Sequence, residues 1–199
     1  MFAALTGAGL SAAAGLNAYV PFLLVAIVAR FSDVITLPAS FEWIESPWAI
    51  GGATLLLLTE VVLDKIPAVD SLNDIVGTAV RPTIGGVVAA ATSSAGTLDN
   101  STFMTENPWI SAIGGGLIAA VVHAGKASAR PLINTASVGL GAPIVSTAED
   151  VSSIGLSLIA IFIPVLVIVA LAVLAWVMWR LIRRVRRYGR RRRDAEALV

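Results

Sequence analysis

The chain has 199 residues, of which 57% are hydrophobic and only 14% are charged, and its mean hydropathy is +0.86. Soluble domains are about half apolar and about one quarter charged, so this composition excludes an ordinary soluble fold and indicates a membrane protein. The chain has no cysteine and a single histidine, His123, which excludes disulfides, a structural zinc site, a bis-histidine haem and an iron–sulfur cluster within this chain alone.

The hydrophobic stretches predict about six membrane spans. The last stretch is the clearest, because it carries no charge over about 33 Å of helix, which matches a hydrocarbon core of roughly 30 Å. Trp176 and Trp179 end it at the level of an interfacial aromatic belt, and Pro164 predicts a kink in its outer half. The predicted spans cover residues 12–29, 48–63, 78–91, 109–122, 132–145 (the weakest) and 158–179.

The loops between these stretches predict the orientation. Segments 31–47, 96–108 and 148–152 contain acidic residues and no Lys or Arg. Six passes with both termini in the cytoplasm place every basic residue except Arg30 on the cytoplasmic side of a bacterial plasma membrane, as the positive-inside rule requires. We therefore expect an all-α polytopic bundle with three parts: a repeat-containing membrane bundle (1–152), a C-terminal transmembrane helix (153–182) and a basic cytoplasmic tail (183–199).

The sequence contains residue matches at a constant offset of 61. Repeats with an even number of spans are parallel and related by rotation about the membrane normal. We predict a pseudo-threefold arrangement of helix pairs, in which helices broken by Pro and Gly lie toward the axis; coincidence in a low-complexity chain is the alternative. The matches are Pro47-Trp48 with Pro108-Trp109, Lys65 with Lys126, Asn73 with Asn134, and Pro21 with Pro82 and Pro143.

Two ionisable residues are candidates for a proton or charge site: Glu60, which falls within the span predicted over 48–63, and His123, which directly follows the span predicted over 109–122. The alternative, which their charged neighbours favour, is that both lie at helix ends near the membrane interface. A further set of polar residues falls on the Pro- and Gly-broken stretches and would line a polar axis between them. This set consists of Asn17, Asn73, Thr78, Asn134, Thr135 and Ser137.

Segment 69–81 has apolar residues at helical spacing, and it predicts an amphipathic helix along the cytoplasmic interface. Its polar residues Asp70, Asn73, Asp74 and Arg81 would then face water or a partner subunit; a gating role is the less favoured alternative. No catalytic motif such as a nucleophile elbow, a phosphate-binding loop or a zinc protease helix is present. We therefore expect no enzyme activity, no cofactor and no metal.

The arginine-rich tail begins directly after the last hydrophobic stretch. This position favours anionic lipid headgroups over nucleic acid as its partner, at about 1 kcal/mol per basic residue near the surface. Other membrane protein subunits are the second expected partner. The tail residues expected to make these contacts are Arg183, Arg184, Arg186, Arg187, Arg190 and Arg191.

The motif Ala-Gly-Leu-Asn-Ala-Tyr-Val-Pro at 14–21, the segment 64–74, and His123-Ala-Gly-Lys with Arg130 and Asn134 resemble the DUF4126 family of small bacterial membrane proteins, whose domain has no known function. The resemblance covers about residues 5–150 and carries no site residue. The size and basic tail are also similar to accessory subunits of about 20 kDa in actinobacterial respiratory supercomplexes.

Two functions remain open from the sequence. The first is a non-catalytic accessory or structural subunit of a larger membrane complex, such as a respiratory supercomplex. The second is a small-solute or ion transporter or channel that uses the polar axis.

Overall fold

The computed structural model describes residues 2–98, 103, 106–136 and 141–196. Within these ranges the chain forms α-helices and one short 3-10 helix and has no strand, which confirms the expected helical membrane bundle. Three helical segments are long and apolar enough to cross a membrane: Asn73–Ser93, Pro108–Arg130 and Gly141–Phe162. The helices are α1 (Phe2–Leu16), α2 (Tyr19–Phe31), η1 (Glu42–Glu45), α3 (Pro47–Leu63), α4 (Pro67–Ser93), α6 (Pro108–Ala136), α7 (Gly141–Phe162) and α8 (Leu166–Glu196).

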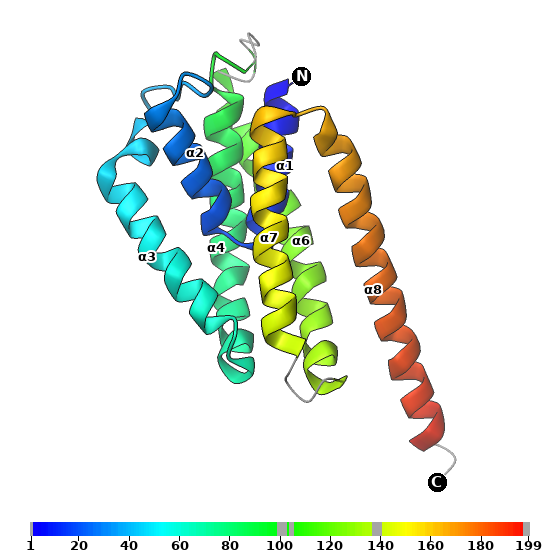
Figure 1. Cartoon of the computed structure of the whole chain (residues 1–199). Helices are drawn as coiled ribbons and strands as arrows, with labels where there is room; N and C mark the ends of the chain where they lie inside the picture. The colour runs from blue at the N-terminus through cyan, green and yellow to red at the C-terminus, as the bar shows by residue number, and fades with distance from the viewer. Residues whose placement is uncertain (1, 99–102, 104–105, 137–140, 197–199) are drawn as a thin grey trace.

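Helix α1 occupies the centre of the bundle and packs against α4, α6 and α7 (Figure 1). It is only about 22 Å long at 1.5 Å per residue, and the chain then turns back at Asn17 and Ala18 to form α2. The Asn17 side chain favours this turn, because its Oδ1 accepts hydrogen bonds from the free backbone N–H groups of Tyr19 (3.1 Å) and Val20 (3.2 Å) at the start of α2. The predicted single span over 12–29 is therefore wrong: α1 and α2 form a hairpin.

Glycines allow α1, α4 and α6 to approach closely. A Cβ atom on Gly115 of α6 would lie 2.4 Å from the Cβ of Ala89 on α4 and 2.6 Å from the Oγ of Ser11 on α1. A Cβ atom on Gly85 of α4 would lie 2.5 Å from the Cβ of Ala119. Contacts this short exclude any side chain, so the sequence positions of these glycines fix where the three helices cross.

The predicted C-terminal span is also wrong, because residues 158–179 do not form one helix. Helix α7 ends at Phe162, the chain reverses, and α8 begins at Leu166 and returns along the bundle (Figure 1). Pro164 lies in the reversal; it has no N–H to donate, and it disfavours helical geometry at Ile163 before it. The expected boundary after residue 152 falls inside α7.

The weak span predicted over 132–145 includes residues 137–140, which lie outside the described residues; its described parts belong to the end of α6 and the start of α7. The repeated Pro-Trp dipeptides do mark equivalent points: Pro47 and Pro108 are the first residues of α3 and α6, which run in the same direction (Figure 1). The predicted breaks at the repeated prolines do not occur in α4, which continues through Pro82.

The two termini of the described chain lie at opposite ends of the bundle (Figure 1). The N-terminal end of α1 lies beside the end of α7, where Thr6 Oγ1 donates a hydrogen bond to the carbonyl oxygen of Ala160 (2.9 Å). This arrangement differs from six passes with both termini on one face. The reason is that the α1–α2 hairpin returns to the end from which it started, and α3, α4, α6, α7 and α8 then alternate in direction.

Candidate functional site

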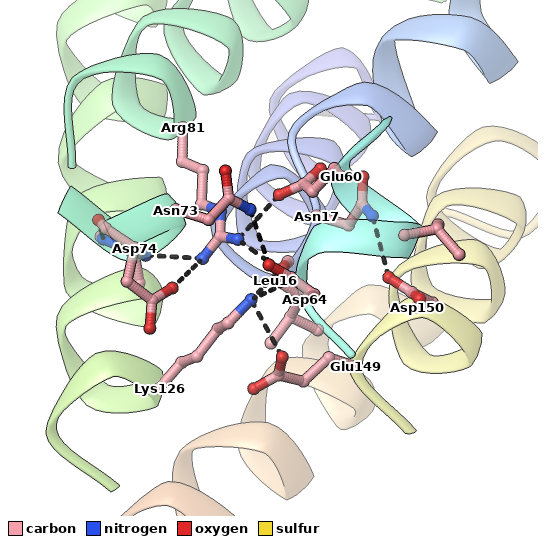
Figure 2. A network of polar contacts seen from close by, with 12 residues as sticks. Leu16, Asn17, Glu60, Asp64, Asn73, Asp74, Arg81, Lys126, Glu149 and Asp150 are labelled. Atoms are coloured by element: carbon pink, nitrogen blue, oxygen red, sulfur yellow. Dashed lines mark hydrogen bonds and ion pairs between the residues drawn. The ribbon is translucent and has the colours of Figure 1, made fainter. Parts of the chain in front are cut away.

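Charged side chains from four helices converge below the α1–α2 hairpin (Figure 2). Most of them are almost completely buried; Arg81 has no exposed surface and Lys126 is 2% exposed. We call this set the buried charge cluster. It consists of Glu60 on α3, Asp64 just beyond α3, Asp74 and Arg81 on α4, His123, Lys126 and Arg130 on α6, and Glu149 and Asp150 on α7.

Arg81 lies at the centre of the buried charge cluster. Its guanidinium donates to Glu60 Oε1 (2.8 Å) and to Asp74 Oδ1 (3.2 Å), and it lies 3.8 Å from Asp64 Oδ2. Gly77 makes room for it one turn earlier on α4, because a Cβ atom there would lie 3.2 Å from Arg81 Nε. Arg81 therefore joins α3 to α4.

Lys126 connects the buried charge cluster to the C-terminal end of α1. Its ammonium group donates to the carbonyl oxygen of Leu16 (2.9 Å), which is the last residue of α1. The same group pairs with Glu149 Oε2 (2.9 Å) and lies 3.8 Å from Asp64 Oδ2. The end of α1 carries free carbonyl oxygens and a partial negative charge, so a cation is favourable at this position.

Asp64 and Arg130 complete the connections between α3 and α6. Arg130 pairs with Asp64 Oδ2 (3.3 Å), with Glu149, and with Asp74 Oδ2 (3.6 Å). Asn73 donates to the other oxygen of Asp64 (2.6 Å). Burial alone raises the pKa of the Asp64 carboxyl, but Lys126, Arg130 and its other partners together hold that pKa below its usual value.

The neighbours of His123 define its protonation state. Arg81 lies 2.8 Å from His123 Nδ1, and a guanidinium only donates, so Nδ1 must accept and carries no proton. The proton of the neutral ring is then on Nε2, which lies 3.2 Å from both Thr78 Oγ1 and the carbonyl oxygen of Asp74. His123 is a neutral ring that helps to hold Arg81 in place.

Asn17 links the hairpin turn to α7. Its Nδ2 donates to Asp150 Oδ1 (2.8 Å) while its Oδ1 caps α2. Ser153, one turn further along α7, donates to the carbonyl oxygen of Ala13 (3.0 Å). The turn of the hairpin is thus held by α7 on one side and by Lys126 on the other.

The structure brings together several residues that the sequence singled out. Glu60 and His123 both contact Arg81, and Asn17, Asn73 and Thr78 bond to members of the cluster. The side chains of Asn134 and Thr135 on α6, and the whole of Ser137, lie outside the described residues, so their place on a polar axis is untested. The middle of the bundle is occupied by α1.

Two expectations about charged residues are wrong. Glu149 and Asp150 were expected in an outer loop, but both lie on α7 beside Lys126 and Asn17. Arg81 was expected on the polar face of an interfacial helix, but it is fully buried. Helical spacing is a sequence signal for other members of the cluster: Glu60 and Asp64 are four residues apart, as are Lys126 and Arg130, and Asp74 lies seven residues before Arg81.

On α8, Arg183 and Arg184 are exposed. Arg180 and Arg183 lie over the rings of Trp176 (5.0 Å) and Trp179 (4.2 Å), respectively. The side chains of Arg186, Arg187, Arg190 and Arg191 lie outside the described residues.

The chemistry of the cluster follows from its charges and donors. The carboxylates Glu60, Asp64, Asp74, Glu149 and Asp150 outnumber the cations Arg81, Lys126 and Arg130, because His123 is neutral. Among the described residues, no group of three or more His, Asp or Glu side chains has the geometry of a metal site. The arrangement is thus suited to exchanging a proton or another small cation.

A family model described as a domain of unknown function (DUF4126) matches residues 4–184, a range that includes the complete buried charge cluster. Neither a curated protein nor a solved structure matches the chain.

Proposed function

Because this chain belongs to the DUF4126 family, whose description leaves the function open, we propose a function from the site itself: the chain is a small membrane transporter that moves a small cation, in the simplest case a proton, through the buried charge cluster.

The observation that carries this proposal is the burial of many ionisable side chains in a helical bundle, most of them on the three helical segments that are long and apolar enough to span a membrane. Removing each ion from water costs several kcal/mol, and buried ion pairs are often replaceable by apolar residues with no loss of stability. A chain that serves only as a scaffold has no need of them. Ionisable groups within membrane spans commonly mark the route of a proton or an ion.

The α1–α2 hairpin supports the same proposal. Discontinuous helices in transporters end near the middle of the membrane, where their free backbone groups face the transported ion. Here α1 ends at Leu16, and its carbonyl oxygen is already bonded to a cluster cation, Lys126. A cation that enters the cluster would compete with Lys126 for the carbonyl and carboxylate oxygens around it.

For the orientation, we propose that the end of the bundle with α8's arginines faces the cytoplasm of a bacterium, and the end with the N-terminus faces outward. Support comes from the exposed Lys65 near the end with the arginines, and from the exposed Glu42 and the partly buried Glu45 near the end with the N-terminus. The pairs of Arg180 with Trp176 and Arg183 with Trp179 support contact of this end of α8 with anionic lipid headgroups.

The test is transport by the purified protein in liposomes. A potassium diffusion potential, negative inside, drives cations inward, and proton and sodium entry are followed with ion-sensitive dyes. We expect wild-type protein to carry at least one of the two ions and Arg81→Gln to reduce its entry to the rate of protein-free liposomes. Arg30→Gln is the control, since Arg30 lies outside the cluster and donates to the Glu45 carbonyl oxygen. No entry of either ion with wild-type protein would contradict the proposal.

A non-catalytic subunit of a larger membrane complex is the second candidate, and one observation favours it. Helix α8 leans away from the rest of the bundle (Figure 1) and exposes large apolar side chains, including Val173 (55% exposed) and Trp176 (53% exposed). Purification of a tagged chain in a mild detergent should then recover stoichiometric partners. A solitary, monodisperse chain would contradict this second function.

A further inference from the structure

The carboxylates of the buried charge cluster are not equally compensated by their neighbours. Both oxygens of Asp64 have partners: Asn73 on one, and Arg130 with Lys126 and Arg81 on the other. Both oxygens of Asp74 face a guanidinium, Arg81 or Arg130. Each oxygen of these two carboxylates thus faces a cation or accepts a hydrogen bond.

Glu149 and Asp150 on α7 are also accounted for. Glu149 pairs with two cations, Lys126 and Arg130. Asp150 accepts a hydrogen bond from the amide of Asn17 and is only half-buried, so part of its surface stays exposed. Neither residue is a fully buried carboxylate.

Glu60 is the exception. It is only 6% exposed, and among described residues its one ion-pair partner is Arg81, which it shares with Asp64 and Asp74. Its Oε1 accepts from Arg81, whereas no donor in the described part of the chain bonds to its Oε2. A buried carboxylate oxygen without a donor is costly, and adding a proton removes that cost.

We propose that Glu60 is the proton-binding residue of the buried charge cluster, and that the proton binds at Oε2. The inference rests on the proposed transport function and names its ion. A proton from one aqueous side forms an O–H bond with Oε2, which neutralises the carboxylate; its release to the other side restores the charge, so each cycle carries one proton and changes no other bond.

Each helix packed around Glu60 contributes a group that affects this exchange. The titratable and charged groups that face Glu60 are Tyr19 from α2, Asp64 from the end of α3, Arg81 from α4 and Lys126 from α6. Arg81 is the nearest, and protonation of Glu60 leaves it with Asp74 and Asp64 as its anionic partners. Because Glu60 and Ala53 are the buried residues of α3, proton binding also weakens the attachment of α3 to the bundle.

The experiment is infrared difference spectroscopy of the purified full-length protein in lipid, recorded between neutral and acidic pH in H2O and in D2O. A buried, weakly hydrogen-bonded carboxylic acid gives a C=O stretch that is separated from those of exposed carboxyl groups. We expect this band in wild type, in Glu60→Asp and in Glu42→Gln, an exposed control. We expect its loss in Glu60→Gln, which keeps an acceptor for Arg81 but cannot titrate.

Proton entry into liposomes, measured on the same preparations, distinguishes failure of the Glu60 assignment from failure of the proposed transport function. A band that persists in Glu60→Gln, or that disappears only in Asp74→Asn, overturns the assignment of the proton to Glu60. Equal proton entry in wild type and Glu60→Gln also overturns it, while transport by the chain stands. A titrating Glu60 band without proton entry in wild type supports the proton site and overturns the transport function.

Discussion

Lys126 is the side chain that connects the end of α1 to the carboxylates of α7. Its repeat counterpart, Lys65, is exposed and donates to the carbonyl oxygen of Val61 (3.0 Å). We predict that Lys126→Met lowers the free energy of unfolding by about 3–5 kcal/mol, because it leaves the Leu16 carbonyl without its buried cation and removes one of the two cations that pair with Glu149. Denaturant unfolding in detergent, followed by tryptophan fluorescence, measures this change.

Lys65→Met is the matched control for this prediction, and we expect it to change the free energy of unfolding by less than about 0.5 kcal/mol, as surface substitutions usually do. Similar losses from both substitutions would contradict the central position given to Lys126.

The contact between Asn17 and Asp150 makes a second prediction at the residue scale. Asn17→Asp keeps the oxygen that caps α2 but places two carboxylates together, and we expect it to cost about 1–3 kcal/mol of unfolding free energy. Adding Asp150→Asn restores a donor across the contact, so the double variant should recover most of the loss. Thermal unfolding of the four proteins forms the required cycle. Additive losses would show that the two residues do not interact.

At the residue scale, the sequence predicted part of the site. Glu60 and His123 stood out because they are ionisable residues within an apolar stretch or directly after one. Arg81, Glu149 and Asp150 were assigned to interfaces or loops, since a charge near the edge of a hydrophobic stretch is compatible with either position. Their partners are distant in the sequence, as with Arg81 and His123 or Lys126 and Leu16, and no local pattern contains such pairs.

At the element scale, the crossing of α1, α4 and α6 depends on glycine. We predict that Gly115→Ala costs about 1–3 kcal/mol, because the added Cβ would lie 2.4 Å from that of Ala89 and the helices must separate. Gly114→Ala on the same helix is the matched control: a Cβ there meets nothing within 4 Å, and alanine favours the helix by up to about 1 kcal/mol. Thermal unfolding in detergent measures both, and equal stabilities of the two variants would contradict this packing.

The start of a helix could be predicted where a proline directly precedes an apolar stretch, as at Pro47 and Pro108, which begin α3 and α6. The points where the chain turns back within an apolar stretch could not be predicted. Residues on both sides of Asn17 are apolar, so the sequence shows one uninterrupted apolar stretch where the structure has a turn. The turn is stabilised by the Asn17 side chain, which caps α2 and contacts Asp150 of α7. The sequence predicts a kink at Pro164, but a kinked helix and a chain reversal can have the same local sequence. The contacts of α8 with α6 and α7 decide between the two.

At the scale of the whole molecule, the hairpin places the two termini at opposite ends of the bundle (Figure 1). We therefore predict that a tag at the N-terminus is cleaved by protease added to intact spheroplasts, whereas a tag at the C-terminus is cleaved only after the membrane is opened. Cleavage of neither tag in intact spheroplasts would instead favour six spans with both termini in the cytoplasm.

Proton transport through the buried charge cluster is tested by the initial rate of proton entry into liposomes that contain equal amounts of wild type, Glu60→Gln or Glu42→Gln. We predict entry driven by the membrane potential in wild type and in Glu42→Gln, and the rate of protein-free liposomes in Glu60→Gln, because only that substitution removes the uncompensated buried carboxylate. Equal rates in all three proteins, or no entry in any of them, would contradict the claim.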